Sequence, residues 1–333
     1  MAQYMKDDTP LDLNLPTLTS STGVALATGD GASARSRRKG SDAMSFVRAK
    51  AAEAAAKLDA EQAAVVLRAQ HPLWNDEHRG VPNPFLRSSL FTAPISGPRA
   101  FMEEEKVASL SGITVVYTGK ELGQDDLSVL LSLINIASTQ RIGDNVFFTG
   151  YGLAKDLGWS INSASYNKIK ECMGRLKATE LKIQLTDGRR GYAGSLIRDY
   201  EWATRGEDPT GNRSWRVSFD PKIANLFPPD NVTYVAATQR RQIGQKAGLT
   251  LWLHGFWSSH TNPLAISVAK LHELSKSRQK EMRQFKRTLT QSLDRLVRIG
   301  FLEEYSISDR GLVAVKKAPT QRLSGRAQSK QLC

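Results

Sequence analysis

The sequence has few of the residues on which disulfides, membrane spans and secretion depend. Only two of its 333 residues are cysteines, Cys172 and Cys333, so we expect reduced thiols and a cytoplasmic protein. No apolar run approaches the ~18 residues of a transmembrane helix. The N-terminus lacks the basic-then-apolar pattern of a secretion signal. We therefore expect neither membrane insertion nor secretion.

Motifs for catalysis and for cofactors are missing as well. The five histidines have no cysteine or acidic neighbours at metal-site spacing. Gly150-Tyr151-Gly152 lacks the third glycine of a dinucleotide-binding turn, and Gly119-Lys120 lacks the upstream glycine of a phosphate loop. No pairing of a nucleophile with a base is visible. We therefore predict a protein that is not an enzyme and binds no metal or cofactor.

Acidic residues are outnumbered by basic ones. The chain has 46 Lys and Arg against 33 Asp and Glu, which gives a net charge of +13. Such a charge favours polyanionic partners, because binding a phosphate backbone releases its counterions. Ribosomal, RNA-binding and membrane-surface proteins share this property, so the charge alone does not name the partner.

Composition and pattern divide the chain into five parts. The first is rich in small polar residues, the second combines an alanine-rich helix with a proline-rich connector, and the last is a basic tail. Between them we predict two folded domains. The boundaries are 1–43, 44–100, 101–230, 231–317 and 318–333.

A pattern of helix, turn, helix and hairpin begins near Phe148. The expected elements are a helix over 151–157, a turn over 158–163, a helix over 164–179, a strand over 181–186, a turn over 187–191 and a further strand. This order is typical of a winged helix-turn-helix, which places its second helix in a DNA major groove and its hairpin beside it.

The second half repeats the plan without clear sequence identity. We expect a helix over 236–260, a strand over 263–266, helices over 267–275 and 277–298, and strands over 301–307 and 312–316. The predicted fold class is therefore α+β, with two tandem winged helix-turn-helix domains and a disordered or helical N-terminal extension.

The second long helix has one apolar and one basic face. Its apolar face contains Met282, Phe285, Leu289, Leu293 and Leu296. Its candidate DNA-binding residues are Arg278, Lys280, Arg283, Gln284 and Arg287. Arginine and lysine suit phosphates or guanine, and glutamine suits adenine. The alternative is an ordinary solvated amphipathic helix.

The first long helix sorts in the same way. Its inward positions are Tyr166, Ile169, Met173 and Leu176, and its candidate DNA-binding positions are Asn167, Lys168, Glu171 and Arg175. Glu171 either accepts from a cytosine or pairs within the helix with Lys168 or Arg175, and we favour the second role. Arg189 and Arg190 at the hairpin turn suit phosphate or minor-groove contacts.

Short segments of the chain resemble the TrfA-type plasmid replication initiators, which bind direct repeats called iterons. The resemblance covers about residues 85–306. It is carried by Arg87-Ser88-Ser89-Leu90-Phe91-Thr92, Val116-Tyr117-Thr118-Gly119, Glu121-Leu122, Asp125-Asp126, Asp156-Leu157-Gly158-Trp159-Ser160-Ile161-Asn162, Cys172-Met173-Gly174-Arg175-Leu176, Phe256-Trp257-Ser258-Ser259-His260 and Gly300-Phe301-Leu302-Glu303.

The resemblance implies an initiator that binds double-stranded direct repeats at a plasmid origin. It implies opening of an adjacent AT-rich segment, contact with that segment as single-stranded DNA, and recruitment of the host helicase and host initiator. It also implies copy-number control through a monomer–dimer equilibrium. Such proteins can bind the host sliding clamp through Gln-Leu-Ser/Asp-Leu-Phe; the nearest match, Pro10–Asn14, lacks the Gln and the Phe.

Two other functions fit parts of the pattern. A winged-helix transcriptional regulator would bind DNA in the same way, but on a palindromic operator and without strand opening. A nickase or relaxase would need a tyrosine nucleophile and a metal held by histidines or carboxylates, and the histidine pair is absent.

Overall fold

The computed structural model describes residues 44–55, 74–75, 77–94, 97–110, 113–138, 145–185, 191–202 and 214–319. The chain divides into two units, Met1–Glu53 and Ala54–Cys333, and each is described by itself. Residues 44–55 form a helix with exposed side chains, within the predicted alanine-rich segment. The region predicted to be disordered, 1–43, lies outside the described residues, as does the basic tail after residue 319.

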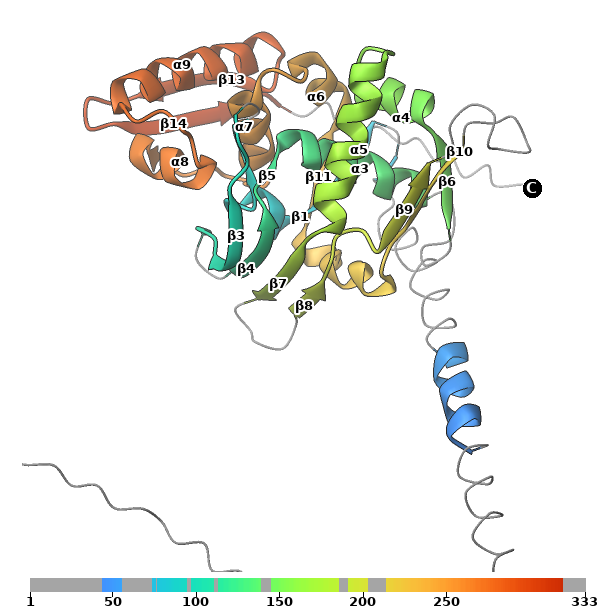
Figure 1. Ribbon diagram of the computed structural model, residues 1–333. Helices are drawn as coiled ribbons and strands as arrows, with labels where there is room; N and C mark the ends of the chain where they lie inside the picture. Colours follow the sequence, from blue (N-terminus) through green and yellow to red (C-terminus); the bar gives the residue numbers. More distant parts are fainter. Residues whose placement is uncertain are drawn as a thin grey trace, which may run out of the picture. The chain divides into compact units, whose positions relative to one another are not determined.

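Helix α3 (Gln124–Ser138) is central to the first half of the larger unit, and nearly all of its side chains are buried. The same half contains two antiparallel sheets with strand orders β3-β4-β7-β8 and β6-β10-β9 (Figure 1). Their strands are β3 (Phe101–Lys106), β4 (Ile113–Lys120), β6 (Val146–Thr149), β7 (Glu180–Leu185), β8 (Gly191–Gly194), β9 (Asp199–Trp202) and β10 (Ser214–Ser218). The chain is therefore a mixed α and β protein, as predicted.

Two capped helices lie between β6 and β7. The hydroxyl of Thr149 accepts a hydrogen bond from the backbone of Gly152 and so begins α4 (Gly150–Leu157). That helix ends at Gly158, whose φ of 68° is favourable only for glycine. The side chain of Asn162 caps the start of α5 (Ser163–Lys177) by accepting a hydrogen bond from the backbone of Ser165. The predicted succession of helix, turn, helix and hairpin is thus present, although residues 186–190 at the hairpin turn lie outside the described part.

The segment before β3 differs from the extended connector that its prolines suggest. Strand β1 (His78–Pro82) pairs with β11 (Val232–Ala236), on the other side of the predicted boundary at residue 230. The following residues form α2 (Asn83–Leu86) and β2 (Phe91–Thr92), which pairs with β5 (Leu122–Gly123). Their apolar side chains are buried in the core, and the backbone partners lie far away in sequence. Local composition therefore carried no signal for this pairing.

The second half has its own apolar core. Here a single helix was expected over 236–260, but Gly244 has a φ of 72° and separates α6 (Ala237–Ile243) from α7 (Gly248–Ser258). The short 3-10 helices η1 (Pro221–Leu226) and η2 (Pro229–Asn231) precede β11. The remaining elements are β12 (Ile266–Ser267), α8 (Val268–Ser275), α9 (Met282–Arg298), β13 (Leu302–Ile307) and β14 (Leu312–Lys317).

The two halves share an order of elements but differ in strand pairing. In the second half β12 pairs with β14, so the first strand and the hairpin form one sheet, β12-β14-β13. In the first half β6 pairs with β10, whereas the hairpin β7–β8 continues the sheet begun by β3 and β4.

Candidate nucleic-acid interface

Helix α9 is fixed by a stripe of fully buried side chains. Phe285, Leu289, Leu293 and Leu296 recur every three or four residues and have no exposed surface. They pack in the core that α7 and α8 also line, and the ring of His272 meets Phe285 edge-on at 4.8 Å. The predicted inward face is confirmed except at Met282, which is 44% exposed at the start of the helix.

The opposite side of α9 carries exposed cations. Arg283, Gln284 and Arg287 lie on that side, Lys280 lies just before the helix begins at Met282, and Lys286 flanks the buried stripe; these five exposed residues are called the α9 basic face. Within the described part of the chain, none of its four cations has a carboxylate within 4 Å. Since no described carboxylate neutralises these side chains, they can reach phosphates or base edges. Of this set, sequence reasoning missed Lys286.

A further cation lies at the hairpin that follows α9. Strands β13 and β14 are joined by a tight turn in which Gly311 has a φ of 73°, and Arg310 is exposed beside that glycine. Figure 1 shows the hairpin next to α9. Arg310 therefore corresponds in position to the hairpin arginines predicted for the first half, and the sequence signal was its place in a glycine turn.

The turn between α8 and α9 differs from the sequence prediction. Helix α9 begins at Met282, so Arg278 lies in the turn before it, and its side chain is held by the first half. The guanidinium of Arg278 donates to Glu121 at 2.6 Å and to the carbonyl of Pro98 at 2.9 Å. Its neighbour Lys276 pairs with Glu105 at 3.0 Å. These two ion pairs tie the turn between α8 and α9 to the first half.

Helix α5 presents fewer free cations than expected. Lys168, predicted to face DNA, has its Nζ 2.5 Å from the carboxylate of Asp125 and lies over the ring of Trp159. Arg175, also predicted to face DNA, donates from Nε to Asp126 at 2.9 Å, and its side chain is 15% exposed. Both carboxylates lie at the buried start of α3, so these residues hold α5 against α3 rather than facing outward.

Electrostatics at this contact match the geometry. Burial opposes the charge on Arg175, but Asp126 more than offsets that effect and leaves the pKa of Arg175 raised. Burial raises the pKa of Asp125, and Lys168 counteracts only part of that rise. The buried thiol of Cys172 likewise has a raised pKa because of burial and the nearby Asp126.

The remaining candidates of the first half divide into two groups. Asn167 and Glu171 are exposed on α5, and Glu171 lies 3.9 Å from Arg175 within the helix, as favoured from sequence. Arg189 and Arg190 lie outside the described residues, and so does the segment Pro10–Asn14. Sequence reasoning missed Lys170, whose Nζ lies over the ring of Trp202, a partly exposed residue of β9, at 4.8 Å.

Within the described part of the chain, none of the helices combines the length and the apolar character that crossing a membrane requires. Among the same residues no three histidine, cysteine or acidic side chains gather as a metal site would.

The fold and the site define a mixed α and β protein with two helix–turn–helix–hairpin units, one of which carries a free basic face. The chain belongs to the TrfA protein family, whose model matches residues 41–317. It is similar to the plasmid replication initiator protein TrfA of Escherichia coli, with 28% identity over 241 residues. The match covers 71% of this chain and 61% of that relative, which is less than two thirds of its length.

Two solved structures are also similar. One contains domains 2 and 3 of RctB as a selenomethionine derivative, with a TM-score of 0.47, 14% identity, and coverage of 69% of this chain and 96% of that one. The other, also of RctB domains 2–3, has a TM-score of 0.44, 14% identity, and coverage of 69% and 95%.

Proposed function

We propose that this chain is a non-enzymatic plasmid replication initiator that binds direct repeats at an origin. The α9 basic face carries the proposal, because its four exposed cations have no carboxylate within 4 Å among the described residues and lie at the start of a helix whose apolar stripe is buried. Membership of the TrfA family and the function named for the Escherichia coli relative support it.

In this proposal each half of the larger unit is a winged helix. Helix α9 enters the major groove of duplex DNA, with Arg283 and Arg287 reaching guanine edges or phosphates and Gln284 reaching adenine. Arg310 on the β13–β14 hairpin contacts the adjacent backbone. In the first half α5 takes the corresponding place, with Asn167 and Lys170 nearest the DNA.

Direct repeats suit this chain better than a palindrome. The two helix–turn–helix–hairpin halves differ in strand pairing and in the number of exposed cations on their second helices. One protomer would therefore read two unlike half-sites in a fixed order. A two-fold operator would instead need two equivalent reading heads.

We further propose that repeat binding opens an adjacent AT-rich segment and helps recruit the host helicase and initiator, with a monomer–dimer equilibrium setting copy number.

DNase footprinting on the DNA beside the gene tests the proposal, at roughly 150 mM salt so that non-specific binding is suppressed. We expect protection of several direct repeats next to an AT-rich tract. Protection of a single inverted repeat over a promoter would contradict the initiator proposal and favour a transcriptional regulator. A plasmid that carries only these repeats and this gene should replicate, and loss of the repeats should abolish that replication.

Two variants at one position separate base reading from phosphate contact. Arg283→Ala should weaken repeat binding by about 1–3 kcal/mol if it contacts a guanine, and relax specificity at one position. Arg283→Lys keeps the charge but loses the two-pronged geometry, so it should behave like the alanine variant at a guanine and like the wild type at a phosphate. The matched control is Lys222→Ala, which removes an exposed lysine of η1.

A further inference from the structure

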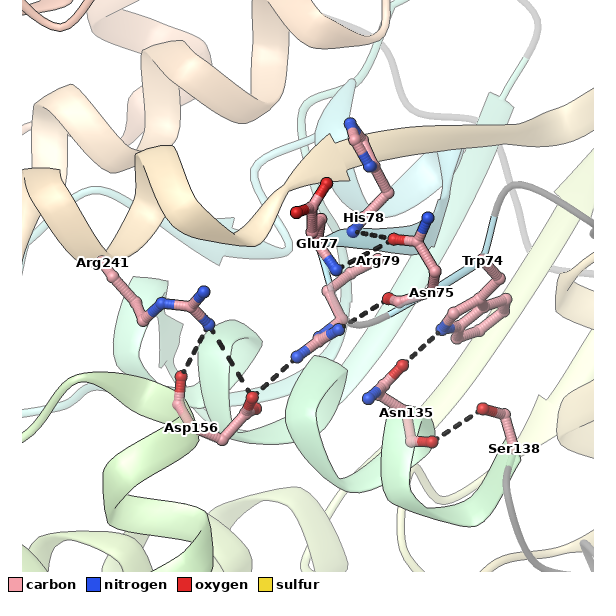
Figure 2. A network of polar contacts seen from close by, with 9 residues as sticks. All are labelled: Trp74, Asn75, Glu77, His78, Arg79, Asn135, Ser138, Asp156 and Arg241. Atoms are coloured by element: carbon pink, nitrogen blue, oxygen red, sulfur yellow. Dashed lines mark hydrogen bonds and ion pairs between the residues drawn. The ribbon is translucent and has the colours of Figure 1, made fainter. Parts of the chain in front are cut away.

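A small cavity, partly open to the surface and lined by charged as well as apolar side chains, lies where α3, the end of α4 and α6 meet. It has a volume of about 40 Å³. That exceeds the ~10–15 Å³ that one water molecule needs, so the cavity has room for more than one water-sized group. Among its lining residues are Arg79, Arg240, Arg241, Asp125, Asp156 and Gln245. Figure 2 shows Arg79 and Arg241, two of these lining residues, converging on Asp156.

Arg240 is a buried cation whose hydrogen-bond partners are all neutral. Its guanidinium donates to the carbonyl of Leu251 at 3.3 Å, to the amide oxygen of Gln124 at 3.2 Å and to the hydroxyl of Ser128 at 3.0 Å. Among the described residues, no carboxylate lies within 4 Å of it. Burial lowers the pKa of Arg240 to about 10, although the more distant charge of Asp125 opposes that shift in part, and Arg240 stays charged at neutral pH. A buried charge of this kind needs a counter-ion.

The two carboxylates that line the cavity are already engaged. Asp125 has Lys168 2.5 Å away. Asp156 is shared between Arg79 at 2.7 Å and Arg241 at 3.8 Å. Four cations, counting Arg240, therefore surround two carboxylates, which leaves two positive charges in excess.

Unused donors lie at the same place. The side-chain nitrogen of Gln245 is buried and has no hydrogen-bond partner among the described residues. Arg241 uses one guanidinium nitrogen on the carbonyl and carboxylate of Asp156, so its other nitrogens remain available. A ligand that accepts several hydrogen bonds and carries one or two negative charges would satisfy both the donors and the excess charge.

We propose that this cavity binds a small tetrahedral oxyanion, represented by inorganic phosphate, between Arg240, Arg241 and Gln245. The oxyanion neutralises Arg240 and joins α6 of the second half to α3 and α4 of the first. Trp159, in the turn that leads into α5, also lines the cavity. Occupancy therefore stiffens the connection between the two helix–turn–helix units. The site does not depend on the proposed DNA function, because its test contains no DNA.

The test is phosphate binding by the full chain at constant ionic strength, with chloride replaced stepwise by phosphate. Thermal unfolding and ³¹P line broadening are measured together. Phosphate also stabilises proteins generally, without saturation, by exclusion from their surface. We therefore expect a saturable rise in melting temperature and one phosphate per chain. A rise that is only linear in phosphate, without line broadening, would overturn the proposal.

Two variants and a control sharpen the result. Arg241→Gln changes a one-third exposed side chain and should fold, and it should weaken phosphate binding roughly tenfold or more. Lys246→Gln removes an exposed charge next to the cavity but outside its lining, and should bind phosphate like the wild type. Equal binding by both variants would refute the assigned donors.

Arg240→Met separates a counter-ion site from a merely structural arginine. In the proposal, phosphate no longer raises the melting temperature of this variant above the general effect, whatever stability the variant loses because Gln124 and Ser128 lose a donor. A structural role alone would lower stability while leaving the phosphate dependence intact. If this variant does not fold, Arg241→Gln still decides the question.

Discussion

Removing the carboxylate of Asp126 should release α5 from α3. This carboxylate is completely buried and makes two hydrogen bonds. One of its oxygens accepts from Nε of Arg175 at 2.9 Å, and the other accepts from the backbone of Gly123 at 2.8 Å. In Asp126→Ala the guanidinium of Arg175 keeps only the thiol of Cys172 and Glu171, 3.9 Å away.

The magnitude follows from burial. Breaking a buried ion pair by removing one partner costs about 3–5 kcal/mol. Arg175 retains some solvent contact and the distant Glu171, so we expect the lower end, about 3 kcal/mol. A unit of this size loses about 2–4 °C of melting temperature per kcal/mol, so the shift should be about 6–12 °C.

Urea unfolding followed by circular dichroism measures this change, with Glu171→Gln as the control. Glu171 is exposed, so its substitution should change the free energy of unfolding by less than about 0.5 kcal/mol. Unchanged stability in Asp126→Ala would refute the reasoning. So would an Arg175→Met variant that stays folded but shows a flatter salt dependence of DNA binding, because Arg175 would then contact a phosphate.

Three further predictions concern other sites. Gly158→Ala should cost about 1–2 kcal/mol in thermal unfolding, because its φ of 68° disfavours a side chain; an unchanged melting temperature would contradict this. Burial, with a smaller effect of Arg240, lowers the pKa of His254 to about 3. The wild type should therefore lose stability as pH falls from about 6.5 towards 3, and His254→Gln should lose less in urea titrations at pH 7 and pH 5; parallel losses would exclude this role. Glu121→Gln should cost about 1–2 kcal/mol in thermal unfolding, since Arg278 is partly solvated and keeps the carbonyl of Pro98; an unchanged melting temperature would argue against this.

Local patterns predicted the elements of the two helix–turn–helix–hairpin units well. The apolar stripe from Phe285 to Leu296 repeats with the period of a helix over three turns. Glycines mark the turns between neighbouring elements. The order of helix, helix and hairpin could therefore be predicted from residues near each other in sequence. The basic face of α9 followed from the same period.

Pairings between distant segments could not be predicted in this way. Strand β1 pairs with β11, which lies far later in the sequence, and nothing in the proline-rich sequence of β1 indicates that partner. The inward position of Arg175 depends on Asp126, which lies 49 residues earlier on α3. A helical wheel orders residues around one helix, but it cannot show that a second helix covers the flank.

The central claim is that the α9 basic face reads the DNA. The most direct measurement is the affinity of Arg283→Ala/Arg287→Ala for the protected repeat and for a scrambled duplex, across a series of salt concentrations. We predict a large loss on the repeat and a much smaller loss on the scrambled duplex, while Lys222→Ala binds like the wild type. Wild-type affinity and an unchanged salt slope in the double variant would contradict the account.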